Sequence, residues 1–277
     1  MKVPGGIYLC QVSDTISCGA CCGLYNTMDA SFETLHARLA SRSAAFARVQ
    51  REPGAIQAFA LDVAAREPSE HPLPGFHHCP FVGLIGPEQA RVGCLLHPLA
   101  EGNNGVDLRG LSHYGGMACK ICFCPAHQVL SARFREILRQ TAPDWHAYGI
   151  LITEARTLEC LLRAAEVVLG TPLTAEAVTG SAERLEGIRA VYDLVLCWPF
   201  RRPGFPLGTF FLGDDQVRKG PVDYASAGGC PSRYDRVLRE LASEFRSSDE
   251  LTRAERLVDE TLGRLASALG TRVRVQA

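Results

Sequence analysis

Apolar residues recur at helical spacing in the first part of the chain. Leu35, Leu39, Phe46 and Val49 fall on one face when the segment is read with 3.6 residues per turn. This spacing predicts a helix over residues 30–51. The Pro53-Gly54 pair ends that pattern, and a second helix is expected over residues 55–66.

Beyond Pro125 the helical pattern becomes nearly continuous. It predicts a helix over residues 126–140 and a long one over 145–169, with Pro143 in the first turn and Gly170 as the C-terminal stop. A start at Thr171-Pro172 leads to a further helix that runs to residue 197. The second half of the chain is therefore expected to be helical.

The C-terminal segment carries a helix start signal of its own. Ser247 and Glu250 have the spacing of a capping box, which predicts a last helix that Gly270 closes and a short strand over residues 271–276. The Pro/Gly-rich residues 198–230 are expected to form a long loop, and such loops in compact domains are usually functional or disordered.

These patterns predict a mainly α fold with minor β structure. Residues 1–127 are expected to form a cysteine-rich, metal-binding region with two helices and an irregular, loop-rich segment, and residues 128–277 a helical region. The loop-rich part lies between His71 and Pro125, where glycine and proline predict turns in place of long elements.

The charges of the chain are balanced. Its 277 residues include 29 Lys and Arg against 30 Asp and Glu, so no overall field would attract nucleic acid or an anionic membrane. No secretion signal is visible, and charged residues interrupt the most apolar run, 151–168. We expect a soluble, cytoplasmic protein with no membrane span, whose partner is an unidentified protein or small molecule.

Cysteine usage is the strongest chemical signal. Nine of the twelve cysteines lie in the first 124 residues. Cytosolic thiols are normally kept reduced, so a disulfide framework explains them poorly. They are candidate ligands of zinc or iron, as single ions or as an iron–sulfur cluster: Cys10, Cys18, Cys21, Cys22, Cys79, Cys94, Cys119, Cys122 and Cys124.

Two cysteine pairs have chelate spacing. Two residues separate Cys18 from Cys21, and two separate Cys119 from Cys122, so each pair can turn both sulfurs toward one ion. The number of cysteines exceeds one four-coordinate site. This excess favours two metals, or one iron–sulfur cluster with one ion, and spacing leaves the distribution of ligands open.

Other cysteines and histidines allow two interpretations. His97 and His127 are candidate ligands, while His77 and His78 are expected in loops or behind the ligands. Cys10 lies in an apolar run, where a buried small side chain explains it as well as a ligand does. A further two, Cys160 and Cys197, stand in apolar helical contexts and are expected in the core.

The order of these segments resembles a known family. SCGACCG, CPFVG, GCLLHP and the later cysteine group are similar to the CxxCxxCC family of zinc- or iron-chelating domains, often called YkgJ-like, over roughly residues 10–127. Thr15 stands where the family has its first cysteine, and Cys10 is a candidate replacement. The resemblance implies a bound metal, and a related cluster occurs in flagellin lysine N-methylases.

Two classes of function follow. The first is a metal-binding protein whose thiolate-bound metal is structural, with the helical half as a docking or substrate surface, since closed four-thiolate sites leave no position for water. The second is an enzyme, either an iron–sulfur redox protein or a lysine N-methylase-like transferase, with the 198–230 loop near its active site. A non-haem iron oxidase is a third possibility. No GxGxxG, P-loop or GxSxG motif supports nucleotide or serine-hydrolase chemistry.

Overall fold

The part of the chain that the structure describes is mainly helical, with one short antiparallel hairpin, which confirms the predicted fold class. The computed structural model describes residues 7–67, 70–76, 78–121, 124–208 and 219–270. Its α-helices and strands in chain order are α1 (Phe32–Phe46), α2 (Pro53–Arg66), β1 (Val82–Ile85), β2 (Arg91–Cys94), α3 (Gly115–Ile121), α4 (Ala126–Val129), α5 (Ala132–Thr141), α6 (Trp145–Thr153), α7 (Ala155–Leu169), α8 (Ala175–Thr179), α9 (Ala182–Leu196), α10 (Asp235–Glu240) and α11 (Ser248–Ala268).

The first helix is shorter than its hydrophobic pattern predicts. Ser31 caps α1 by accepting a hydrogen bond from the Thr34 amide at 3.4 Å, and the helix ends at Phe46, so Val49 lies beyond it. Leu35 and Leu39 are fully buried, as expected from their spacing. The next helix, α2, begins at Pro53, because proline fits the first helical turn without losing a needed amide.

A hairpin follows within the region expected to consist of turns. Val82 pairs with Cys94 and Ile85 with Arg91, so Cys94 ends the hairpin beside the first residue of β1. The hairpin packs against α1, where Ser43 Oγ donates to the Leu84 carbonyl at 2.9 Å and accepts from the Leu84 amide at 2.8 Å. The sheet therefore fixes Cys94 relative to α1.

The long helix predicted over 145–169 is interrupted. Asp144 caps α6, with Pro143 before the helix and not in its first turn, and Glu154 separates α6 from α7. The carboxylate of Glu154 is buried and binds Lys219 and the Gly208 amide, which side-chain periodicity alone does not reveal. Gly170, with φ of 66°, ends α7 as predicted.

Capping residues divide the other predicted helices. Ser131 separates α4 from α5 within the predicted 126–140 helix. Beyond Gly170 the chain forms α8 and then α9, each with its own cap at Thr174 and Ser181, in place of one helix that starts at Thr171. At α11, Ser247 accepts from the Glu250 amide, as the capping box predicts.

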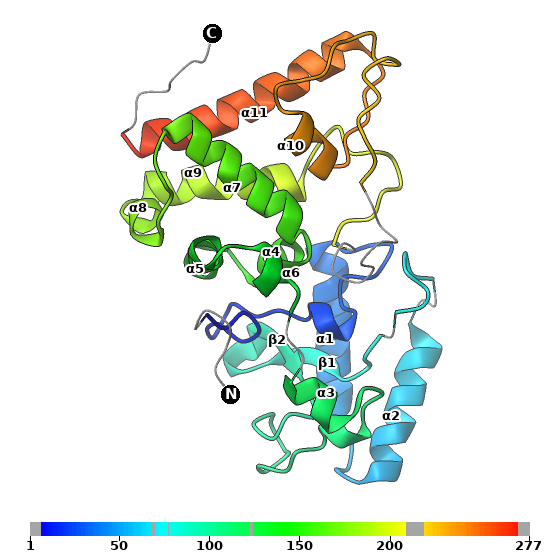
Figure 1. Cartoon of the computed structure of the whole chain (residues 1–277). Helices are drawn as coiled ribbons and strands as arrows, with labels where there is room; N and C mark the ends of the chain where they lie inside the picture. The colour runs from blue at the N-terminus through cyan, green and yellow to red at the C-terminus, as the bar shows by residue number, and fades with distance from the viewer. Residues whose placement is uncertain (1–6, 68–69, 77, 122–123, 209–218, 271–277) are drawn as a thin grey trace.

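The structure has two hydrophobic cores, and each includes residues from the other half of the chain. The N-terminal core gathers α1, α2 and the hairpin with Trp145 and Ile150 of α6, and the C-terminal core gathers α5 to α11 with Leu9, Ile16 and Cys124. Figure 1 shows α1, α2, β1, β2 and α3 in one half of the molecule and α7, α9 and α11 in the other. The segment around residues 9–25 thus passes between the two cores.

The described parts of the predicted loop are 198–208 and 219–230. Residues 209–218 and the predicted strand 271–276 lie outside the described residues. A short helix, α10, follows the loop, and α7 packs against it. Among the helices that the structure describes, none has both the length and the apolarity needed to cross a lipid bilayer.

Candidate metal centre

The N-terminal cysteines are brought together by short elements far apart in sequence. Cys22 ends the 3-10 helix Ala20–Cys22, and its carbonyl accepts a hydrogen bond from the Cys79 amide at 3.0 Å. Cys94 ends β2, and Cys119 lies on α3. The hairpin and these backbone contacts position the thiols before any ion is considered.

Four thiols form what we call the inner sulfur group: Cys22, Cys79, Cys94 and Cys119. A hydrogen bond between the Cys22 and Cys79 thiols raises the pKa of Cys22 well above its ordinary value, and burial and the charges of Cys79, Cys94 and Cys119 raise it further. The pKa of Cys79 is lowered, chiefly because its thiolate accepts the Cys22 hydrogen bond. Cys79 is therefore the first of the two to ionise.

Arg109 supplies positive charge to this group. Burial raises the pKa of Cys94 to about 12, the Cys79 and Cys119 thiolates raise it too, and the Leu96 amide and Arg109 oppose the rise. Conversely, the pKa of Arg109 is raised by its hydrogen bond to Asp107 and also by the charges of Cys94 and Cys119. The group is thus electrostatically coupled to a guanidinium, which favours its anionic form.

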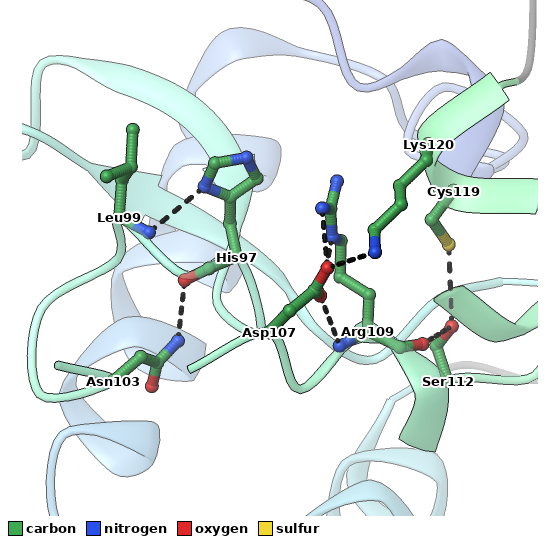
Figure 2. A network of polar contacts seen from close by, with 8 residues as sticks. All are labelled: His97, Leu99, Asn103, Asp107, Arg109, Ser112, Cys119 and Lys120. Atoms are coloured by element: carbon green, nitrogen blue, oxygen red, sulfur yellow. Dashed lines mark hydrogen bonds and ion pairs between the residues drawn. The ribbon is translucent and has the colours of Figure 1, made fainter. Parts of the chain in front are cut away.

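Asp107 holds that guanidinium in place. Its carboxylate accepts from Arg109 Nε at 2.9 Å and Nη2 at 2.8 Å, and Lys120 Nζ lies 2.7 Å from the same carboxylate. Figure 2 shows Asp107 between the two cations. These hydrogen bonds hold the pKa of Asp107 well below its usual range, and the bond from Arg109 contributes more than the bond from Lys120.

Ser112 links this network to Cys119. Its hydroxyl donates to the Arg109 carbonyl at 2.8 Å and lies 3.5 Å from the Cys119 sulfur. In Figure 2 the Cys119 sulfur points toward Ser112. Cys119 is exposed, whereas Cys79 is buried. The inner sulfur group therefore has one member on its solvent side.

A second set of thiols, the outer sulfur group, consists of Cys10, Cys18 and Cys124. Burial raises the pKa of Cys18 well above its ordinary value, and the charges of Cys124 and Cys10 add to the rise. The Cys18 amide donates to the Cys10 carbonyl at 2.9 Å, and the Ala20 amide donates to the Cys18 sulfur at 3.4 Å. These contacts place Cys18, the first residue of the Cys18–Cys21 pair, beside Cys10 in the segment that precedes it.

Two tyrosines border the outer sulfur group. Tyr148 Oη donates to the Leu9 carbonyl at 2.8 Å; its pKa is raised by burial and then by Cys18, Cys10 and Cys124. The pKa of Tyr8 is raised by burial, by the charge of Cys10 and by a hydrogen bond with it, with a smaller contribution from Cys21. Cys21 is thus near Tyr8 at this end of the cluster.

The histidines have other contacts. The Leu99 amide donates to His97 Nδ1 at 3.1 Å, His127 Nδ1 lies 2.5 Å from Arg135 Nη1, and His78 Nε2 lies 2.9 Å from Asn26 Nδ2. His71 stacks on His78 at 3.5 Å between ring centroids. The polar contacts use one ring nitrogen each of His97, His127 and His78, and His71 contacts its neighbour through the face of its ring.

The sulfur positions do not form a finished coordination site. Among the residues that the structure describes, no group of three or more His, Cys, Asp or Glu side chains is arranged to hold a metal ion. Cys122, a predicted ligand, and His77, expected in a loop or behind the ligands, lie outside the described residues. The donor set nevertheless fits a thiophilic ion, because soft thiolates from separate segments select zinc or iron over magnesium or calcium.

Cysteines outside the two groups follow the prediction in part. Cys160 is buried in the C-terminal core, as expected. Cys197 was expected in the core but is exposed, because it caps the C-terminus of α9, where the apolar pattern ends. It lies on the edge of a cleft of about 550 Å³, together with Thr27, His146 and Phe205.

Spacing arguments missed the polar and aromatic neighbours of the thiols. Tyr8, Tyr148, Arg109 and Ser112 carry no motif, and each reaches the cysteines through the fold. A sequence signal existed for Arg109, since Asp107 and Arg109 form an opposite-charge pair within a glycine-rich loop.

Comparison with known proteins adds no further identification. No family model, curated protein or solved structure matches this chain.

Proposed function

We propose that this chain is a metal-binding protein in which cysteine thiolates hold zinc or iron, mainly to stabilise the N-terminal half. The observation that supports the proposal is the electrostatic coupling among Cys22, Cys79, Cys94 and Cys119, which come from four separate segments of the chain. Buried thiols that raise one another's pKa are costly to ionise alone, and a bound divalent cation offsets that repulsion.

The outer sulfur group supports a second site. Cys18 is coupled with both Cys10 and Cys124, and the inner sulfur group uses none of the three. Two groups agree with the proposal of two metals, or one cluster and one ion. The order of the cysteine segments, with Cys10 beside Cys18 where Thr15 replaces a cysteine, also agrees with a YkgJ-like CxxCxxCC domain.

Loss of a single thiol tests the proposal. Cys79→Ser is expected to lower the metal content by about one equivalent, since a hydroxyl is a poor replacement for a thiolate ligand. Cys160→Ser is the matched control, because Cys160 is also a buried thiol but lies in the C-terminal core. Elemental analysis of protein purified without oxygen measures both. Equal metal content in the two variants and the wild type would contradict the proposal.

An enzyme remains the second candidate, and one observation favours it. The cleft of about 550 Å³ is lined by four residues of the segment 27–31, by the start of α6 and by residues 204–207 of the predicted loop, so both halves contribute to it. Such a cleft is of the size that holds small ligands. In this candidate, the cleft is the substrate site of a redox protein or a lysine N-methylase-like transferase.

The two candidates differ in colour and sulfide content. A brown protein that releases acid-labile sulfide in proportion to its iron supports the redox candidate. A colourless protein that contains zinc and no sulfide supports the structural one. For both candidates we propose the cleft, to which α6 and residues 204–207 contribute, as the docking or substrate surface.

A further inference from the structure

We propose that a small pocket between α1 and α2 binds a tetrahedral oxyanion, either free phosphate or the phosphate group of a small ester. The pocket has a volume of about 200 Å³ and is lined by residues of the two helices and by the C-cap of α2: Arg38, Ser41, Arg42, Val63, Arg66 and Glu67. None of these residues lines the cleft or belongs to a sulfur group. The inference therefore goes beyond the proposed function and does not depend on a bound metal.

Helical spacing places three polar residues of α1 at this pocket. Arg38, Ser41 and Arg42 are three and four positions apart, so they lie on one face of the helix. Arg66 stands in the last turn of α2 and lines the same pocket. Guanidinium groups from two helices therefore surround one small volume.

The lining contains three guanidinium groups but one carboxylate. Glu67 is occupied by Arg42, whose Nε and Nη2 lie 2.6 and 2.5 Å from its two carboxylate oxygens. Arg42 also donates through Nη1 to two backbone carbonyls, at 3.1 and 3.3 Å. The charge of Arg42 is thus already paired, and the positive charge left for a ligand is that of Arg38 and Arg66.

Arg38 is incompletely compensated by its neighbours. Its side chain is 14% exposed, yet its Nε lies 3.7 Å from the Glu67 carboxylate, and its hydrogen bond to Thr27 Oγ1 is long, at 3.5 Å. Burial lowers the pKa of Arg38, Glu67 opposes that change, and the like charge of Arg42 adds to it. A mostly buried guanidinium with such weak contacts is costly in free energy, and a bound anion offsets that cost.

Arg66 adds a second, accessible cation. Its side chain is 55% exposed and forms an ion pair with Asp62, one helical turn earlier on α2. An ion pair this exposed contributes little to stability, so the guanidinium can turn toward a ligand at small cost. Ser41 is exposed at the same pocket and offers one hydroxyl donor.

These donors match a tetrahedral oxyanion. A guanidinium presents paired N–H donors that bind two phosphate oxygens at once, and two such groups favour a doubly charged anion over chloride or a single carboxylate. The volume of about 200 Å³ lies below the range of about 300–1,000 Å³ that holds drug-sized ligands, so the site takes a small ion or ester. Glu67 stays bound to Arg42, and the anion contacts Arg38, Arg66 and Ser41.

Titration with inorganic phosphate at constant ionic strength tests the proposal. In two-dimensional amide NMR spectra, the wild type is expected to show saturable shifts at residues of α1 and α2. Arg38→Gln should weaken the affinity about tenfold, because it removes charged hydrogen-bond donors from the pocket. Arg48→Gln is the matched control. It removes the same charge, but Arg48 is exposed, lies beyond α1 and does not line the pocket, so the affinity should stay within about twofold.

A phosphate ester distinguishes the two sources of the ligand. Tighter binding of glycerol phosphate than of inorganic phosphate would assign the site to a small ester, and equal or weaker binding would assign it to free phosphate. Arg66→Gln replaces an exposed side chain, so it tests the site even if Arg38→Gln folds poorly, and it should weaken binding about three- to tenfold. The absence of saturable shifts in the wild type, or equal affinity in Arg38→Gln, Arg66→Gln and Arg48→Gln, would overturn the proposal.

Discussion

Gly149 shows how one residue joins the two halves of the chain. It lies on α6, and a Cβ atom built there would come within 1.7 Å of the Tyr25 hydroxyl. Tyr25 is buried, and its hydroxyl donates to the Trp145 carbonyl at 3.4 Å. A backbone without a side chain is therefore needed where the 20–25 segment crosses α6.

Gly149→Ala is expected to lower the free energy of unfolding by about 1–3 kcal/mol, because the added methyl group forces the Tyr25 ring out of its packed position. Chemical denaturation measures the change. Gly263→Ala on α11 is the matched control, since nothing lies within 4 Å of its Cβ position, and it should leave stability unchanged or raise it by up to about 1 kcal/mol. Equal effects of the two substitutions would disagree with this account.

At the scale of elements, Glu154 explains why one predicted helix is two. Its carboxylate accepts from the Gly208 amide at 3.0 Å and from Thr157 Oγ1 at 2.8 Å, and it forms a buried ion pair with Lys219. Lys219 also donates to the Glu240 carbonyl at 2.5 Å. One carboxylate between α6 and α7 thus binds the last residue of the described part 198–208 and the first residue of the described part 219–230.

Glu154→Gln is expected to destabilise the protein by about 3–5 kcal/mol, because it leaves the Lys219 ammonium buried without a counter-charge. Lys219→Met should cost a similar amount, and the double variant less than the sum of the two. Thermal or urea unfolding of all four proteins completes the cycle. Additive losses would mean that the pair does not interact as the structure indicates.

The same pair predicts a pH dependence. Burial raises the pKa of Glu154, but Lys219 and the hydrogen bonds outweigh burial, so the folded-state pKa lies below its ordinary value of 4.5. A depressed carboxyl pKa contributes stability that is present above 4.5 and is lost as pH falls through the folded value. As pH is lowered from about 5, the free energy of unfolding of the wild type should therefore fall more than that of Glu154→Gln. Denaturant unfolding at a series of pH values measures both.

At the scale of the whole molecule, the two cores provide separate reporters. The chain has two tryptophans, with Trp145 in the N-terminal core and Trp198 in the C-terminal core. The inner sulfur group lies within and beside the N-terminal core. A ligand that binds only the folded form adds stability that grows with its concentration, about 2.7 kcal/mol at a hundredfold excess over Kd.

Under the proposed metal binding, a chelator is therefore expected to lower the thermal transition reported by Trp145 by several degrees, with a smaller change at Trp198. Fluorescence of Trp198→Phe and Trp145→Phe variants separates the two signals. Chelation of the Cys79→Ser variant should have little further effect on Trp145, since its inner site is already impaired. If the chelator leaves the Trp145 transition of the wild type unchanged, no metal stabilises the N-terminal core.

The sequence by itself determined the helical class and the caps at Gly170 and Ser247, and it named the candidate ligands. Helical periodicity, Ser247 with Glu250 and Gly170 act within a few residues of the chain, so local rules locate them. Likewise, the chelate spacing of the thiols is read directly from the sequence, so it predicts metal chemistry before the fold is known. The end of α1 at Phe46 was missed because apolar spacing does not mark where a helix stops.

Only the tertiary structure decided which cysteines meet. Spacing pairs Cys18 with Cys21, but the fold couples Cys22 to Cys79, Cys94 and Cys119, and Cys18 to Cys10 and Cys124. The break at Glu154 and the approach of Arg109 to the thiols also depend on segments distant along the chain. The physical reason is the same in each case: charge coupling and burial depend on distance in space, which sequence separation does not specify.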